Sequence, residues 1–258
     1  MQTDSTTVLD GRDRSADPAH CSDLYEPMVD AGSDGFVVAH LGQSIDGFVA
    51  TETGDSYYVT GQENLDHLHR MRSLADAVVV GAGTVAADDP RLTTRRVAGP
   101  NATRVVLDGR RRLDCTYTVF SDAIAPTLLL CATGYGAPAR FGLAEVVALP
   151  AESGHIEPRL IIDTLAARGL RRVFVEGGGA VVTAFLRAGV LDRLQLTIAP
   201  VMIGKGRPGV RAPAKAAMAD CLRPPHRLFR LGEDVLYDYD LRGEPQQQLL
   251  GSTVERIR

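Results

Sequence analysis

A glycine-rich segment, VFVEGGGAVVTAFLRAG at 173–189, could bind a phosphate. An apolar run ends at Glu176, three glycines follow, and a helical pattern starts at once. Glycines let a phosphate approach the backbone closely, and a helix N-terminus presents N–H groups to an anion. A tight strand-to-helix turn that needs glycine for its conformation would explain the same residues. The spacing fits neither the Rossmann GxGxxG pattern nor a P-loop, so neither of those folds is indicated.

A second segment, VVVGAGTVAADDPRLTTR at 78–95, places small residues after a buried run. The small residues at 81–83 leave room for a cofactor. Asp88 and Asp89 could accept ribose hydroxyls or cap a turn, and Arg95 could form a two-pronged contact with a phosphate. A solvated loop with an Asp-Pro turn is the simpler explanation of these residues. Both interpretations stay open on these residues alone.

A third segment, AHLGQSIDGFVATETGDSYYVTG at 39–61, contains a turn from Ser44 to Gly47. Asp46 is expected to form a hydrogen bond within that turn. By itself this segment indicates no particular chemistry.

Two histidines and an arginine lie on the predicted helix that follows. His67 and His69 are two positions apart and so on different helix faces, which makes them poor joint metal ligands and predicts solvated side chains. Arg72 lies near the end of the helix, where its charge complements the helix dipole, or it faces a pocket. The four cysteines are far apart and show no zinc-type spacing, so no metal site is expected.

Apolar runs and helical patterns alternate between these segments. Thr60 followed by Glu63 predicts a capping box, and Leu65, Leu68 and Met71 form an apolar stripe through about Leu74. Helices are also predicted from Pro158 to Gly169 and over 179–188, and a closing antiparallel pair near the end turns at Gly232. Strands are predicted at 36–41, 77–81, 103–108, 125–131, 172–176 and 193–200. This alternation indicates an α/β domain.

The composition is that of an ordinary globular protein. Apolar residues make up 45% and charged residues 23% of the 258 residues, and the net charge is −4. Such a chain lacks the basic face that a nucleic acid requires, although a few arginines suffice for a small anionic substrate. No apolar stretch approaches the roughly 18 residues of a membrane span, and the N-terminus lacks the apolar region of a secretory signal.

The domain boundaries follow from the polar ends of the sequence. Residues 1–34 are predicted to form a flexible tail, 35–242 one folded domain, and 243–258 a second polar tail. Widely spaced cysteines indicate reduced thiols, so a cytoplasmic location is expected.

The three segments, in this order, resemble the reductase domain of the bifunctional riboflavin-biosynthesis deaminase-reductase and its stand-alone relatives. The resemblance runs from about Phe36 to Leu241 and rests on an ordered set of motifs. These are QSIDG (43–47), GAGTVAADDPRLTTR (81–95), RVVLD (104–108), EGGG (176–179) and IAPVMIGKGRPG (198–209). The HxE…PCxxC signature of the zinc deaminase is absent from the sequence.

The resemblance implies a dihydrofolate-reductase-like fold with a central mixed sheet flanked by helices, and a homodimer. It implies NADPH as hydride donor and a phosphoribosylamino-pyrimidine substrate whose ribosyl group is reduced to ribityl. The implied NADPH contacts are Gly42, Tyr58, Thr84, Asp88, Gly109, Gly178, Gly179, Ala180 and Val181. The implied substrate contacts are Ser56, Arg72, Leu92, Arg95 and Glu176.

The resemblance also implies roles for some of these residues. Gly178, Gly179, Ala180 and Val181 would receive the cofactor pyrophosphate, and Glu176 would be the catalytic group that manages one proton. Arg72 and Arg95 would bind the sugar 5′-phosphate together, so replacing either is expected to raise the substrate KM alike.

Two positions depart from the family pattern. His40 stands where the family commonly has Lys, and Phe48 where it often has Lys or Arg. The loss of cations leaves open a paralogous NADPH reductase of another pteridine or secondary-metabolite substrate. A nucleotide-binding protein without turnover is a further alternative, and an intact set of substrate arginines argues against it.

Overall fold

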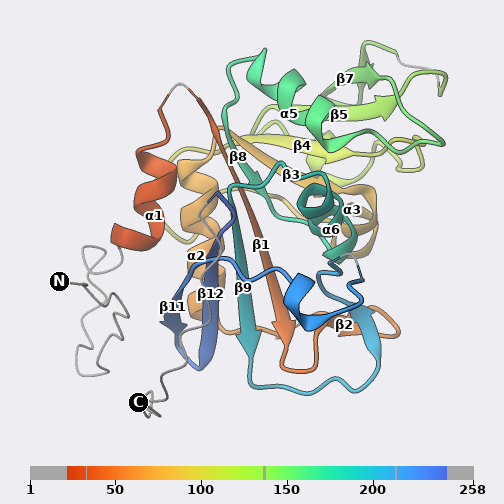
Figure 1. Ribbon diagram of the computed structural model, residues 1–258. Coiled ribbons are helices and arrows are strands. Elements are labelled where there is room, and N and C mark those ends of the chain that lie inside the picture. Colours follow the sequence, from red (N-terminus) through yellow and green to blue (C-terminus); the bar gives the residue numbers. More distant parts are fainter. Residues whose placement is uncertain (1–21, 33, 58, 136–137, 213, 243–258) are drawn as a thin grey trace, which may run out of the picture.

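A ten-stranded mixed sheet forms the centre of the protein (Figure 1). The computed structural model describes residues 22–32, 34–57, 59–135, 138–212 and 214–242. Its parallel strands, in spatial order, are β9 (Arg193–Ala199), β1 (Phe36–Ser44), β8 (Arg172–Val175), β3 (Ala77–Gly81), β4 (Thr103–Leu107), β5 (Thr127–Ala132) and β7 (Ala144–Leu149).

Antiparallel strands complete both edges of the sheet. They are β12 (Asp234–Asp240) and β11 (His226–Leu231) beside β9, and β6 (Arg140–Phe141) beside β7. The terminal hairpin was predicted, and its turn contains Gly232 at φ +64. A separate two-stranded sheet pairs β2 (Phe48–Thr51) with β10 (Gly206–Pro208).

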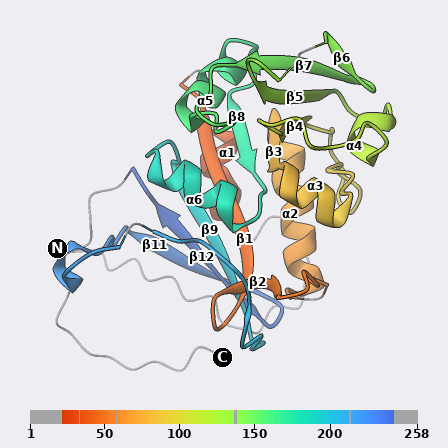
Figure 2. The same cartoon turned by 90° about the vertical axis from the view of Figure 1, so that its right-hand side faces the viewer.

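Helices cover both faces of the sheet, as Figure 2 shows from the side. Alternate residues of each strand point to opposite faces, so one strand contributes side chains to two separate cores. In β1, Val37 and Ala39 pack with α5 (Pro158–Ala166) and α6 (Gly179–Arg187). The other core includes Phe36 and Val38 of β1. It packs against α1 (Ser22–Val29), α2 (Gln62–Leu74), α3 (Ala82–Asp88) and α4 (Thr118–Ser121).

The predicted α/β architecture and its main elements are confirmed, with one correction at the N-terminus. Residues 22–29 were expected to belong to a flexible tail, but they form α1. The side chains of Leu24 and Met28 are buried, so tertiary packing stabilises this short helix. Residues 1–21 and 243–258, where the remaining tails were predicted, lie outside the described residues.

Helix α2 differs from its prediction in how it begins and in what it buries. Gly61 is the N-cap and no side chain caps the helix, so the predicted capping box is wrong. Thr60 Oγ1 instead accepts from Asn64 Nδ2 at 2.9 Å. Leu65 of the expected apolar stripe is 37% exposed, whereas Met71 is buried.

The predicted solvation of the two histidines on α2 is also wrong. His67 and His69 are both buried. His67 Nδ1 lies 3.1 Å from Tyr25 Oη, and its Nε2 lies 2.9 Å from Gln195 Oε1. Polar partners from distant segments therefore allow this helix face to be buried without being apolar.

The described residues also bear on membrane association and thiol chemistry. Among them, no helix combines the length and the apolar character needed to cross a bilayer. Cys115, Cys131 and Cys221 are free thiols. No cluster of metal-binding side chains occurs in the part of the chain that the structure describes.

Candidate active site

The motif segments meet at one edge of the sheet, where neighbouring parallel strands end. Strand β1 leads into the turn at 44–47, β8 into Glu176 and the glycines, and β3 into α3. Strand β4 lies next to β3 and leads to Gly109. The carboxyl ends of parallel strands are where open α/β sheets bind ligands, so this edge is the candidate site.

The glycine turn after β8 contains two glycines with different physical roles. A Cβ on Gly178 would meet Thr84 Oγ1 at 3.5 Å, an ordinary contact, so this position has room in front of it. A Cβ on Gly179 would lie 2.4 Å from the carbonyl oxygen of Gly209, which forces glycine there for chain packing. Gly178 is thus free to face a ligand, whereas Gly179 matches the simpler interpretation of a tight turn.

The first turn of α6 begins directly after Gly178. Gly178 is the helix N-cap with extended backbone, and its N–H donates to Thr84 Oγ1 at 3.3 Å. Ala180 is exposed and Val181 is half-buried, so the first turn borders open space. An N-terminal helix turn with an uncrowded glycine suits a phosphate group.

Glu176 and Arg72 form a two-pronged ion pair between β8 and α2. Arg72 Nε donates to Glu176 Oε2 at 2.6 Å, and Arg72 Nη2 donates to Glu176 Oε1. Arg72 Nη1 also donates to the carbonyl oxygen of Thr93 at 3.1 Å. Burial by itself would lower the pKa of Arg72, but the charge and hydrogen bonds of Glu176 raise it. Arg72 is therefore committed to a protein carboxylate, and this changes its expected role.

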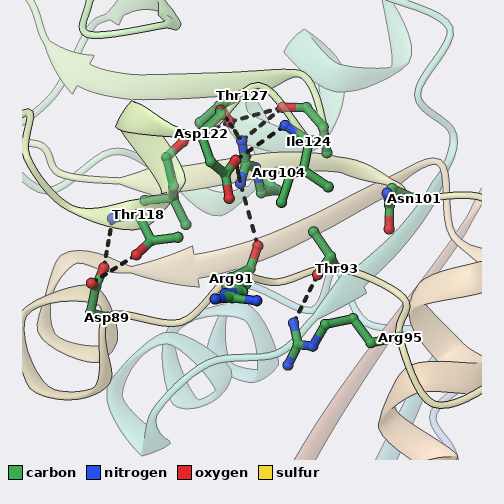
Figure 3. Close-up of polar contacts among 12 residues, drawn as sticks. Asp89, Arg91, Thr93, Arg95, Asn101, Arg104, Thr118, Asp122, Ile124 and Thr127 are labelled. Atoms are coloured by element: carbon green, nitrogen blue, oxygen red, sulfur yellow. Dashed lines mark hydrogen bonds and ion pairs between the residues drawn. The ribbon is translucent and has the colours of Figure 1, made fainter.

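The loop after α3 carries a cluster of positive charge (Figure 3). Arg91 and Arg95 flank Thr93, and Arg95 Nη1 donates to Thr93 Oγ1 at 2.8 Å. Burial lowers the pKa of Arg95, and the nearby charges of Arg72 and Arg91 lower it further. Clustered cations with one nearby carboxylate favour the binding of an anion. Arg91 was not among the predicted site residues, and only its place in the DDPRLTTR motif could have indicated it.

Contacts on both sides hold this loop in place. Asp89 adopts φ +39 and accepts the N–H and hydroxyl of Thr118 at 2.7 and 2.8 Å. Arg104 is fully buried, and its Nη1 donates to the carbonyl oxygen of Arg91 at 3.4 Å and to Asp122 Oδ1 at 2.6 Å. Figure 3 shows both sets of contacts. The loop is thus held in place by specific contacts, while Asp89, Arg91 and Arg95 remain exposed to solvent.

Leu92 was predicted as a substrate contact, and its side chain cannot serve that role. It is buried in the core beneath the sheet, with the backbone at φ +54. Its contribution to a ligand is limited to its backbone.

The remaining predicted residues differ in their surroundings. Gly42 on β1 packs closely on Thr60, since a Cβ there would lie 2.7 Å from Thr60 Cγ2. Ser56 is half-buried, and Asp88 is exposed at the end of α3. Tyr58 lies outside the described residues.

Gly109 lines a cavity of about 320 Å³ on the α6 side of the sheet. A Cβ on Gly109 would lie 1.9 Å from the carbonyl oxygen of Gly154, so loop packing explains this glycine. The cavity wall also includes Arg110, Arg112, Ile156 and Val181. An apolar floor with two arginines suits a nucleoside that carries a phosphate.

His40 does not replace the cation that the family commonly has at its position. Its Nε2 lies 3.0 Å from Asn64 Oδ1 and 3.1 Å from Thr197 Oγ1, and the side chain is buried. Burial lowers its pKa well below the usual value, the nearby His67 lowers it further, and the bond to Asn64 opposes the shift. Phe48 is half-buried at the start of β2. Neither residue supplies positive charge at neutral pH.

The fold and the site define an α/β protein with a glycine turn at a helix N-terminus and a cationic loop at the carboxyl edge of its sheet. Residues 35–223 match the family described as the RibD C-terminal domain. This chain belongs to that family.

The most informative relatives differ in length. The chain is 34% identical to the 2,5-diamino-6-ribosylamino-4(3H)-pyrimidinone 5′-phosphate reductase of Methanothermobacter thermautotrophicus, over 81% of this chain and 99% of that protein. It is 35% identical to the riboflavin biosynthesis protein RibD of Bacillus amyloliquefaciens, over 66% of this chain and 46% of that protein. The chain therefore spans about half of the bacterial RibD protein and nearly the whole archaeal one.

Solved structures agree on the fold. The deaminase/5-amino-6-(5-phosphoribosylamino)uracil reductase of Thermotoga maritima superposes with a TM-score of 0.69 at 26% identity, covering 84% of this chain and 59% of that one. The Saccharomyces cerevisiae reductase Rib7 superposes with a TM-score of 0.68 at 19% identity, covering 85% and 98%. The latter likeness concerns the fold alone.

Proposed function

We propose that this chain is an NADPH-dependent reductase that converts the ribosyl group of a phosphoribosylamino-pyrimidine to ribityl in riboflavin biosynthesis. One observation carries the proposal: Glu176 lies between a glycine turn with room for a phosphate and a loop with a cationic cluster. A reductase of this kind needs one site for each of two phosphorylated ligands. The similarity to an archaeal reductase over 99% of its length supports the same assignment.

The cofactor site in this proposal extends from the glycine turn to the cavity beside Gly109. Gly178, Gly179, Ala180 and Val181, at the N-terminus of α6, would hold the pyrophosphate. Thr84 and Asp88 border this position, and the adenosine occupies the cavity with Arg110 and Arg112. When bound at these residues, NADPH would supply the hydride that reduces the C1′=N bond of the ring-opened substrate to an amine, and the protein would supply one proton.

The protein's own residues orient the substrate and stabilise charge. Arg95, with Arg91, holds the 5′-phosphate, and Ser56 and the backbone at Leu92 border the sugar. Glu176 remains the proposed catalytic residue. Because it is paired with Arg72, we assign it the stabilisation of charge in addition to the handling of a proton. A carboxylate held by two hydrogen bonds stabilises positive charge at C1′ and nitrogen, and it directs a proton through water.

The decisive measurement is the oxidation of NADPH on addition of the phosphoribosylamino-pyrimidine, followed by absorbance. We expect turnover with NADPH and weaker binding of NADH, because the two arginines of the cavity favour a 2′-phosphate. Tighter or equal NADH binding contradicts the cofactor assignment. No oxidation with either the deaminated or the diamino pyrimidine supports a paralogous substrate, which the uncharged His40 also favours. If no tested substrate is turned over, the result supports the alternative of a nucleotide-binding protein without catalytic activity.

Gly178→Val should block NADPH binding and leave the fold intact. The backbone at Gly178 has φ −63, so valine fits the chain but fills the space proposed for the pyrophosphate. Isothermal titration with NADPH measures the loss, and circular dichroism checks the fold. Gly179→Ala is the contrasting variant, since its Cβ would meet the carbonyl of Gly209 and lower the melting temperature. Unchanged NADPH affinity in folded Gly178→Val restores the simple-turn interpretation.

The proposal also includes a homodimer, as the family resemblance implies, and a cytoplasmic location, as the widely spaced cysteines indicate. Its ligands are small molecules, and neither a nucleic acid nor a membrane is a partner.

A further inference from the structure

His69 contacts the cationic loop through the loop's backbone. Its side chain is 5% exposed on α2, a helix that packs beside the sheet. The Nδ1 atom accepts the backbone N–H of Arg95 at 2.8 Å and lies 3.4 Å from the N–H of Arg96. An atom that accepts from an amide carries no proton, so the ring proton belongs on Nε2.

The local charges keep His69 in this neutral form. Burial, together with the charges of Arg72, Arg95 and Arg96, lowers its pKa to about 4, and the charge of Asp66 opposes this shift. Nδ1 is therefore an acceptor throughout the neutral range. The geometry does not depend on this shift, because the 2.8 Å contact itself requires an acceptor.

The contact with His69 fixes the backbone position from which the Arg95 side chain extends. The His69 bond fixes the Arg95 backbone nitrogen, and the bond from Nη1 to Thr93 Oγ1 fixes the guanidinium. An arginine anchored at both ends loses less conformational entropy when it binds an anion. Without His69, the amide of Arg95 would lack its partner, and this stretch of loop could rearrange.

We propose that His69 is a positioning residue for the substrate phosphate: its Nδ1 fixes the backbone of Arg95 and so preorganises the anion site. This proposal rests on the proposed function in placing the phosphate at Arg95. His69 acts through the Arg95 backbone, so its effect should fall on phosphate affinity and not on the chemical step.

Two variants of matched size test the role of the acceptor. His69→Asn places Oδ1 close to the position of Nδ1 and keeps the acceptor, whereas His69→Leu removes it. We expect His69→Leu to raise the substrate KM roughly tenfold, the effect of one lost hydrogen bond. Its kcat and NADPH affinity should change little, and His69→Asn should stay within about threefold of wild type on the same scale.

A double-mutant cycle links the effect to Arg95. In an Arg95→Ala background, His69→Leu should raise KM by less than about twofold, because the group that it positions is gone. His67→Leu is the control on the same helix: it breaks buried contacts to Tyr25 and Gln195 and should lower stability without raising KM. If His69→Leu does not fold, His69→Gln replaces it, since its acceptor is displaced by one bond.

Ribose 5-phosphate binding separates this proposal from the proposed function. If the wild type binds ribose 5-phosphate, and His69→Leu weakens that binding while His69→Asn does not, the positioning role stands even without pyrimidine turnover. A loss of kcat with unchanged KM would overturn it. The proposal would also be overturned if His69→Leu raised KM equally in the wild-type and Arg95→Ala backgrounds. The same holds if the wild type did not bind ribose 5-phosphate.

Discussion

Arg95→Ala should raise the KM for the phosphorylated substrate by about ten- to a hundredfold and leave NADPH affinity unchanged. A hydrogen bond to a charged group contributes roughly 1.5–3 kcal/mol, and about 1.4 kcal/mol corresponds to a factor of ten. Arg95 lies on the cationic loop and Gly178 on the separate glycine turn, so the loss should concern one ligand. Steady-state kinetics and an independent NADPH titration measure the two effects.

A neighbouring arginine provides the matched control for this prediction. Arg96 follows directly on the same loop, but its Nε donates to Asp66 at the surface. Arg96→Ala removes an equal charge without removing the proposed phosphate ligand, so its KM should stay near the wild-type value. A dephosphorylated substrate should be poor for wild type, and Arg95→Ala should discriminate little against it. If Arg95→Ala weakens NADPH instead, the arginine belongs to the cofactor site.

Arg72→Ala should lower kcat about a hundredfold, because it releases the carboxylate that the reaction requires in a defined orientation. It should also destabilise the protein by about 3 kcal/mol, since removing one partner leaves the other charge largely buried and unpaired. The Arg72 and Glu176 side chains are 9% and 17% exposed, so solvent compensates little. This expectation replaces the one drawn from sequence, in which Arg72 and Arg95 would act alike on KM.

Stability and activity of paired variants check the Arg72 assignment. Glu176→Gln should lose activity with less destabilisation than Arg72→Ala, because the amide oxygen of glutamine can still accept a hydrogen bond from Arg72. The Arg72→Ala/Glu176→Ala double variant should lose less stability than the sum of the losses in the two single variants. Thermal denaturation and single-turnover kinetics measure both. If Arg72→Ala instead raises KM as Arg95→Ala does and leaves kcat unchanged, Arg72 binds the substrate phosphate, as the resemblance implies.

The amino-acid sequence by itself determined the main elements and their two-sided burial. Runs such as AVVVG at 77–81 are apolar at every position, which is typical of parallel strands covered on both faces. The glycines at 177–179 follow the end of β8, and the acidic and basic residues at 88–95 lie at and after the end of the short helix α3, which begins where β3 ends, so local pattern indicated both as candidate site segments. Their order along the chain was enough to indicate the family that residues 35–223 match.

Only the tertiary structure decided which partner each polar side chain has. Glu176 takes Arg72 from a helix 104 positions earlier, and Gln195 lies beside His67 across 128 positions. Gly179 is required because a loop thirty positions later passes over it. Such contacts depend on where distant segments pack, and no local pattern encodes that. Burial of a histidine or an arginine is tolerated when distant groups satisfy it, and those groups are brought together by the folded chain.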